Sequence, residues 1–234
     1  MFQGFQKAVT FSYDDGITQD QRLIRILNKY GLKCTFNLNS GLLGTHNSLL
    51  REDVTVAHVK PRACEVRKIY AGHEIAAHTL THPVLKDLPD DEVVHQVEDD
   101  RLALSELAGY EVVGMAYPCG TYAYDTRVVD LIRRRTGIRY ARNTTSTFGF
   151  DPQPDLLTFE PTVYHHGNWD RLFETGRRFL ALKPDRPQLL YVWGHAYEFD
   201  IYPERWEQFE EFCRMISGQP DIFYGTNREV LLGD

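Results

Sequence analysis

The chain has 234 residues, 42% of them hydrophobic, which suits one large globular domain, residues 1–234, with a sizeable core. Its 26 basic and 33 acidic residues give a net charge of −7 without a long basic block, so nucleic acid is not an expected partner. No run reaches the ~18 apolar residues of a membrane span. The first residues do not resemble a signal peptide, and the four cysteines are widely scattered. We therefore expect a cytoplasmic protein with reduced thiols.

Apolar runs of strand length alternate with longer amphipathic segments along the chain. The predicted strands cover residues 7–13, 33–38, 73–77, 111–116, 138–141, 158–163, 188–193 and 221–224. The predicted helices cover residues 18–30, 62–70, 89–109, 125–136, 168–182 and 203–217. Residues 39–60 follow neither pattern and are interpreted as irregular. Alternation of this kind predicts a parallel sheet with crossover helices, and seven or eight units favour an α/β fold of the distorted TIM-like (β/α) barrel type.

Polar residues follow several of the predicted strands directly. They are Asp14-Asp15, His78, Pro118-Cys119-Gly120, Arg142 and His195. Active sites of such barrels lie at the carboxyl ends of the strands, so we expect these groups to meet at one mouth although they lie far apart in the sequence.

The polar residues at these strand ends include the components of a hydrolytic metal site. His78 and His82 are four residues apart, and two histidines with one carboxylate form the ligand set of a catalytic zinc site. A second carboxylate and His195 would then be available as base and acid. Each feature has a structural alternative: Asp14-Asp15 before glycine can form a turn, and the histidines can be ordinary buried residues.

Three segments resemble the motifs of the polysaccharide deacetylases, carbohydrate esterase family 4, which have the NodB-like deacetylase fold. The first family motif is T-F-D-D-G, and residues 10–16 match it at Asp14-Asp15-Gly16. The second motif, H-[ST]-x-x-H, is matched fully by residues 78–82. The fifth motif, an apolar residue and histidine at a strand end, is matched loosely by residues 192–195. The resemblance extends from residue 7 to about residue 200.

The resemblance implies a role for each of these residues. Asp15, His78 and His82 would bind a divalent metal, most often Zn²⁺, with Co²⁺, Ni²⁺ or Mn²⁺ as alternatives. Asp14 would be the general base for the metal-bound water, and His195 the general acid for the leaving amine.

The third motif, R-x-P-x-G, is altered in this chain. Residues 116–120 read Ala-Tyr-Pro-Cys-Gly, so alanine replaces the arginine that orients the base in the family. Our hypothesis is that Arg142, at the next strand end, reaches Asp14 instead; the alternative is a surface arginine. The backbone N–H of Cys119 remains a candidate oxyanion donor, while the Cys119 side chain is expected to be inert packing.

The fourth motif, an aspartate-tryptophan segment that tunes the acid histidine, has no clean match. Asn168-Trp169-Asp170 is only superficially similar and also suits the start of a helix. His165 and His166 are candidate residues of the substrate groove. Trp193 is predicted to form either an acetyl-methyl pocket or part of the core, and Tyr117 either to stack on a sugar ring or to fill the core.

The function implied by this resemblance is metal-dependent removal of acetyl groups from N-acetylated sugars of the N-acetylglucosamine type. The expected partner is therefore a carbohydrate or another small N-acetylated substrate, and the oligomeric state stays open. Two alternatives are a hydrolase of another small amide or O-acetyl ester, and a catalytically silent carbohydrate-binding barrel. A silent protein need not retain Asp14, Asp15, His78, His82 and His195 together.

Overall fold

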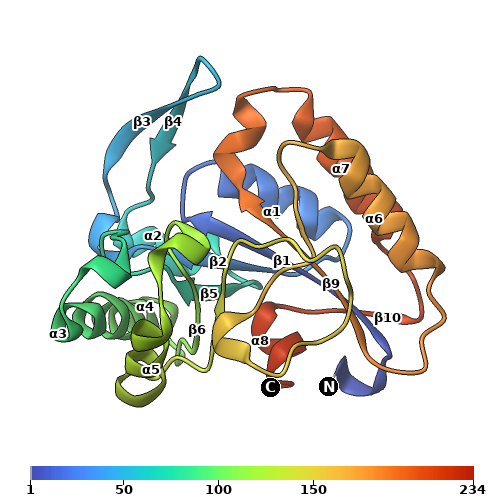
Figure 1. Ribbon diagram of the computed structural model, residues 1–234. Coiled ribbons are helices and arrows are strands. Elements are labelled where there is room, and N and C mark those ends of the chain that lie inside the picture. The colour runs from blue at the N-terminus through green and yellow to red at the C-terminus, as the bar shows by residue number, and fades with distance from the viewer. Residues whose placement is uncertain (1) are drawn as a thin grey trace.

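Eight parallel strands form the main sheet of the computed structural model, which describes residues 2–234 (Figure 1). Their order is β7–β6–β5–β2–β1–β9–β8, and β10 pairs with the beginning of β1. The strands are β1 (Lys7–Asp15), β2 (Cys34–Leu38), β5 (Glu74–Ala77), β6 (Gly114–Ala116), β7 (Tyr140–Arg142), β8 (Val163–Tyr164), β9 (Gln188–His195) and β10 (Ile222–Tyr224). The sheet curls into a half-barrel. At the edge of β7 that β6 does not occupy, Arg142 forms an isolated parallel bridge with Phe159.

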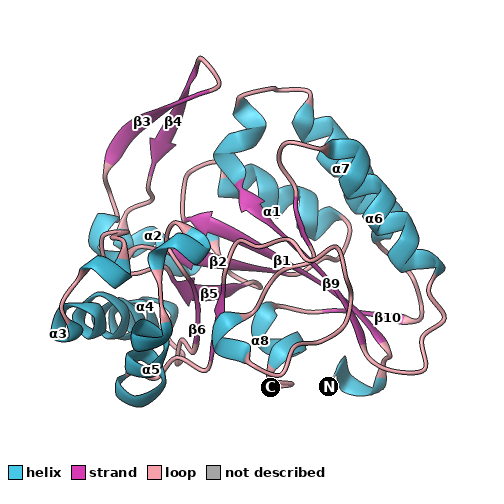
Figure 2. Cartoon of the chain, viewed as in Figure 1, coloured by secondary structure: helices cyan, strands magenta, loops and turns pink. Residues whose placement is uncertain are grey.

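Helices flank this sheet, as Figure 2 shows. They are α1 (Asp20–Lys29), α2 (Ala63–Ile69), α3 (Asp90–Val94), α4 (Asp100–Ala108), α5 (Thr126–Arg135), α6 (Trp169–Ala181), α7 (Arg205–Ile216) and α8 (Asn227–Leu231). A π-helical segment, His95–Asp99, joins α3 to α4, so the predicted helix over residues 89–109 is one continuous helical stretch. It ends at Gly109, whose φ of 80° is a left-handed conformation that glycine adopts without strain.

Strand β1 places the two acidic residues at the centre of the sheet edge. All nine of its residues are buried. Strand β9 pairs with one of its edges, and β10 and β2 share the other. Asp14 lies opposite His195 in the β1–β9 register, and Asp15 lies opposite Leu38 of β2. The carboxyl end of β5, next to β2, leads directly into His78. Parallel pairing therefore gathers the predicted polar residues at one edge, as expected.

A β-hairpin stands apart from the main sheet at the upper left of Figures 1 and 2. It consists of β3 (His46–Arg51) and β4 (Val54–Val59), paired antiparallel and joined by Glu52 and Asp53. Both turn residues have positive φ, 48° and 64°, as a tight two-residue hairpin turn requires. The prediction that residues 39–60 are irregular was therefore wrong.

Most other predicted elements are confirmed within a few residues, and the barrel-type α/β fold is confirmed. The strand predicted over residues 158–163 was wrong: a 3₁₀ turn covers Leu156–Thr158, and β8 begins only at Val163. Pro161 lies within that segment and has no N–H to donate to a ladder. The short helix α8 was not predicted.

All four cysteines are free of disulfide bonds, with Cys34 and Cys213 buried and Cys64 and Cys119 exposed. Within residues 2–234, no helix combines the length and apolar character that a membrane crossing demands.

Candidate functional site

A cavity of about 410 Å³ lies at the carboxyl ends of the central strands. Its walls include both carboxylates of β1 and four histidines. These residues are Asp14, Asp15, His58, His78, His82 and His195. Tyr117, Cys119 and Trp193 also line the cavity. Four elements of the fold, far apart in the sequence, thus bring their polar side chains to one hollow.

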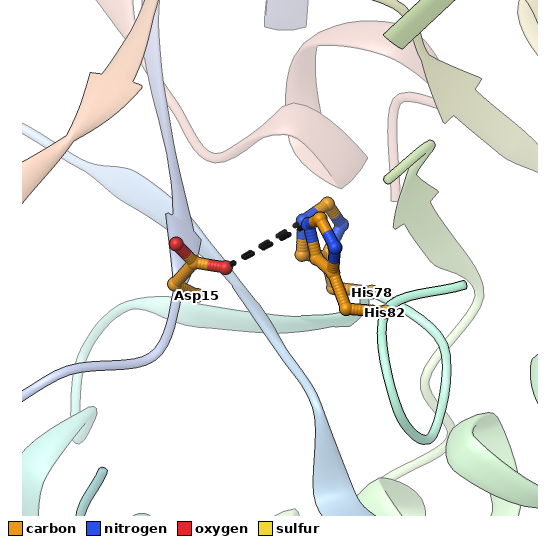
Figure 3. Close-up of side chains that lie close together, drawn as sticks. All are labelled: Asp15, His78 and His82. Carbon is orange, nitrogen blue, oxygen red and sulfur yellow. Dashed lines mark ion pairs between the residues drawn. The ribbon is translucent and has the colours of Figure 1, made fainter. Parts of the chain in front are cut away.

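Asp15, His78 and His82 converge on one point, as Figure 3 shows. Asp15 Oδ1 lies 3.9 Å from His82 Nε2 and 4.0 Å from His78 Nε2. His78 is buried, and its Nδ1–H donates to the carbonyl oxygen of Ala116 at 2.8 Å. Burial lowers the pKa of His78 to about 4, so this imidazole is neutral at neutral pH and Nε2 carries a free lone pair. One carboxylate oxygen and two imidazole nitrogens fit the donor set of a divalent cation such as Zn²⁺.

The backbone at this triad is strained. Asp15, Thr79 and His82 have φ values of 78°, 66° and 62°, which are uncommon for residues other than glycine. Such conformations persist where the surrounding structure enforces them and are concentrated at functional sites.

Asp14 is buried beside the triad and is held by two donors. Arg142 Nη2 donates to Asp14 Oδ2 at 2.5 Å, and Asn37 Nδ2 donates to Asp14 Oδ1 at 2.8 Å. Arg142 is itself buried, and its guanidinium lies 4.4 Å from the centre of the Trp193 ring. The structure therefore places Arg142 against Asp14, where the family's third motif would have placed its own arginine.

Replacing Arg142 with alanine is expected to lower turnover at least tenfold. The change removes the arginine partner of a buried carboxylate, which typically costs ~3–5 kcal/mol, and leaves Asn37 as the donor that still holds Asp14. The turnover number at saturating substrate is the measurement, and Arg142→Lys should restore part of the rate. Arg139→Ala is the matched control, because Arg139 is an exposed partner of Asp234 on the same segment. Unchanged turnover in folded Arg142→Ala would reject an orienting role.

His195 faces Asp14 with one ring nitrogen and is hydrogen-bonded to Glu198 through the other. His195 Nε2 lies 4.0 Å from Asp14 Oδ2, while Nδ1–H donates to Glu198 Oε1 at 3.1 Å. Burial would lower the pKa of His195, but the carboxylates of Glu198, Asp15 and Asp14 together raise it to about 9. His195 is therefore protonated at neutral pH, which suits a general acid.

Glu198 is a residue that the sequence reasoning missed. Its Oε2 accepts from His165 Nε2 at 2.8 Å, and Tyr164 donates its hydroxyl to Oε1. Burial would raise the pKa of Glu198, but His195 and His165 outweigh it and hold that pKa well below its ordinary value. A carboxylate three residues after His195 was the available signal. Glu198 therefore contacts His195, the histidine that the fourth motif is expected to tune.

His165 and His166 do not line the cavity, which corrects the expectation that they form the substrate groove. His165 is fully buried, accepts from the Tyr13 hydroxyl at Nδ1 and packs beneath Gly194. A Cβ on Gly194 would lie 2.7 Å from the His165 ring, so glycine is needed there for the close approach. His166 instead contacts Glu52 of the hairpin at 2.8 Å.

The remaining predicted residues do reach the cavity. Trp193 and Tyr117 are buried residues with one side on the cavity, so both belong to the core as well as to the site. Cys119 is exposed, which corrects the expectation of inert packing. Its φ of 55° turns the backbone sharply, and its N–H has no acceptor within residues 2–234. The hairpin adds His58 and Lys60, which the sequence reasoning also missed.

Residues 3–141, more than half of the chain, match the family model for polysaccharide deacetylase. The chain belongs to the polysaccharide deacetylase family. The match covers both predicted ligand segments and ends just before Arg142. No curated protein sequence matches the chain significantly.

Solved structures similar to this polysaccharide deacetylase family member differ in activity. The Streptococcus pyogenes deacetylase PplD, solved with acetate, is 20% identical with a TM-score of 0.53, and the alignment covers 64% of this chain and 61% of PplD. A family 4 carbohydrate esterase pseudoenzyme from Bacillus anthracis is 17% identical, with a TM-score of 0.58 and coverages of 97% and 66%. The allantoinase PuuE is 12% identical, with a TM-score of 0.71 and coverages of 98% and 91%.

This chain therefore spans less than two thirds of the length of PplD and of the pseudoenzyme. At these identities the likeness establishes a shared fold. Since the same fold is found in a deacetylase, a pseudoenzyme and an allantoinase, the reaction of this family member has to be argued from its side chains.

Proposed function

We propose that this chain is a divalent-metal-dependent hydrolase that removes acetyl groups from N-acetylated sugars of the N-acetylglucosamine type. The observation that carries the proposal is the pairing of a complete ligand triad with an adjacent carboxylate and imidazole, all on one cavity. Family membership supports the reaction class. The cavity of about 410 Å³ suits one sugar unit or a similarly small group.

Each residue of the site has a chemical task in this mechanism. A divalent cation held by Asp15, His78 and His82 would act as a Lewis acid on the amide carbonyl and on water. The Asp14 carboxylate, fixed by Arg142, accepts a proton from the attacking water. The Cys119 N–H donates to the carbonyl oxygen as negative charge develops there.

His195 acts as the general acid in the second half of the reaction. Because Nδ1–H is engaged by Glu198, Nε2–H is the proton available to the departing nitrogen. Protonation of that nitrogen breaks the C–N bond, and acetate and a free amine leave. Trp193 and Tyr117 provide an apolar wall beside the reacting group.

The test is acetate release from N-acetylglucosamine oligomers by protein stripped with a chelator and then reloaded with zinc. We expect no release from the stripped protein and restored release after one zinc is bound per chain. No release in either state, with no zinc bound, would contradict the proposal and support a silent barrel.

A second candidate is hydrolysis of another small amide or an O-acetyl ester. The hairpin favours it, since Leu49 and Arg51 of β3 line the cavity and restrict the room for a long polymer. One bound zinc per chain with no release from sugar oligomers, and turnover of small amides or acetyl esters, would identify this alternative.

A further inference from the structure

The inner face of the β3–β4 hairpin is turned toward the cavity. Side chains two residues apart on a strand share a face, and Val54, Val56 and His58 form that series in β4, with Lys60 directly after it. Val56 is buried in the core, whereas His58 and Lys60 line the cavity. Both polar side chains contact the same residue, the candidate metal ligand Asp15.

His58 contacts the carboxylate oxygen that the triad does not use. His58 Nε2 lies 3.1 Å from Asp15 Oδ2, while Oδ1 is the oxygen that faces His78 and His82. A carboxylate can rotate about its terminal bond, and an N–H bound to one oxygen fixes the direction of the other. Outer partners of this kind typically contribute ~10–100-fold to metal affinity.

Lys60 holds the backbone of the same ligand. Its side chain is buried, and Nζ donates to the carbonyl oxygen of Asp15 and to Asn39 Oδ1, the latter at 3.1 Å. Asn39 Nδ2 in turn donates to the carbonyl oxygens of His78 and Thr79. One buried ammonium therefore links the two chain segments that supply the triad, and it supports the left-handed φ of Asp15.

We infer that the β3–β4 hairpin is part of the metal site, with His58 and Lys60 acting as positioning residues that preorganise Asp15 for a divalent cation. This inference rests on the metal-binding part of the proposed function and does not depend on the substrate. In this inference Asp15, His78 and His82 supply the ligand atoms. The hairpin fixes the orientation of the Asp15 carboxylate toward the cation.

The hairpin is fastened at its tip and at its base, which lets it hold Asp15 in one position. At the tip, Glu52 accepts from His166 at 2.8 Å and from the Tyr202 hydroxyl at 2.9 Å. At the base, Gln19 donates to the Ala57 carbonyl oxygen at 2.8 Å and the Thr18 N–H donates to Val59. The contacts of His166 thus belong to the anchoring of the hairpin, outside the cavity.

The inference is tested by zinc affinity, measured by competition with a chromophoric chelator at fixed pH. We expect His58→Ala to bind one zinc per chain with a Kd ~10–100-fold weaker, because all three ligands remain but Asp15 is no longer aimed. His58→Gln should recover part of the affinity, since its amide N–H can still donate to Asp15. His95→Ala is the matched control, because His95 is exposed, pairs with Asp99 and lies outside the lining of the cavity.

Two results would overturn the positioning role of His58. A zinc affinity of His58→Ala within twofold of both the parent and His95→Ala would show that Asp15 needs no support. Loss of binding as complete as in His78→Ala would make His58 a direct ligand instead.

Lys60→Met gives an independent arm, because it keeps the apolar stem and removes only the ammonium. We expect a weaker zinc Kd here too, and unchanged affinity in this folded variant would reject the role of Lys60. The zinc measurements test this inference separately from the proposed reaction. Weakened zinc binding in the variants, without acetate release from any sugar, would support this inference and reject the proposed function. Zinc-dependent acetate release with unaltered zinc affinity in all variants would reject this inference and support the proposed function.

Discussion

Asparagine in place of Asp14 is expected to reduce turnover by ~10²–10⁴-fold, the usual contribution of a general base. The side chain keeps its size but loses the charge that accepts a proton. Zinc stoichiometry should stay at one per chain, because Asp14 is not among the three converging ligands. The measurements are acetate release at saturating substrate and zinc content of the same preparation.

Asp15→Asn is the matched control, because it changes the adjacent residue in the same way. Asp15 Oδ1 faces the two histidines, so this variant should lose zinc as well as turnover. Both variants would then lose turnover, but only Asp15→Asn would lose zinc, which separates a catalytic carboxylate from a metal-binding one. Full activity in Asp14→Asn, or equal zinc loss in both variants, would contradict the assignment. A silent sugar-binding barrel has no turnover to lose in either.

The sequence predicted those parts of the molecule in which local pattern and tertiary environment agree. β1 is a run of β-forming residues buried on both faces, and α1 has a clear apolar stripe that ends before Gly31. Because parallel strands end at a common edge, the meeting of Asp14, His78 and His195 followed from their places at the ends of predicted strands. The family motifs were recognisable at the same three places.

The hairpin escaped prediction because its turn lacks the usual residues. A two-residue turn with positive φ at both positions is normally marked by Asn-Gly or Asp-Gly, whereas this chain uses Glu52-Asp53. Tertiary contacts supply the missing preference, since Glu52 is held by His166 and Tyr202. The roles of His58 and Lys60 depended on recognising that turn, so they were missed with it.

The partners of the proposed catalytic residues could be predicted only where the ends of neighbouring strands bring them together. Arg142 lies at the end of β7, two strands from β5, and its reach to Asp14 was inferable from the missing third-motif arginine. Glu198 is different, because it lies in a short 3₁₀ segment after β9 that folds back on His195. A turn of that kind depends on the buried His165 and the partly buried Tyr164, both of which hydrogen-bond to Glu198, and no local pattern reveals these contacts.

Glu198→Gln is expected to move the basic limb of the pH–rate profile from near pH 9 to lower pH. The proton on His195 is lost as pH rises through its pKa, so a raised pKa keeps the acid form at higher pH. Removing the Glu198 charge takes away the largest of the carboxylate contributions that raise this pKa. Burial, which favours the neutral imidazole, is then opposed by Asp15 and Asp14 without Glu198. The protonated fraction of His195, and with it the rate, should therefore fall more at pH 8 than at pH 6.

The measurement is kcat from pH 5.5 to 9.5 for the parent, for Glu198→Gln and for Glu174→Gln, an exposed control on α6. A loss that grows with pH would identify Glu198 as the group that keeps His195 protonated. A loss of equal size at pH 6 and pH 8 would instead mean that Glu198 only packs the loop. The first result would explain how this chain retains an acid histidine without the family's fourth motif, because a carboxylate on the loop after β9 provides the same charge from a different element.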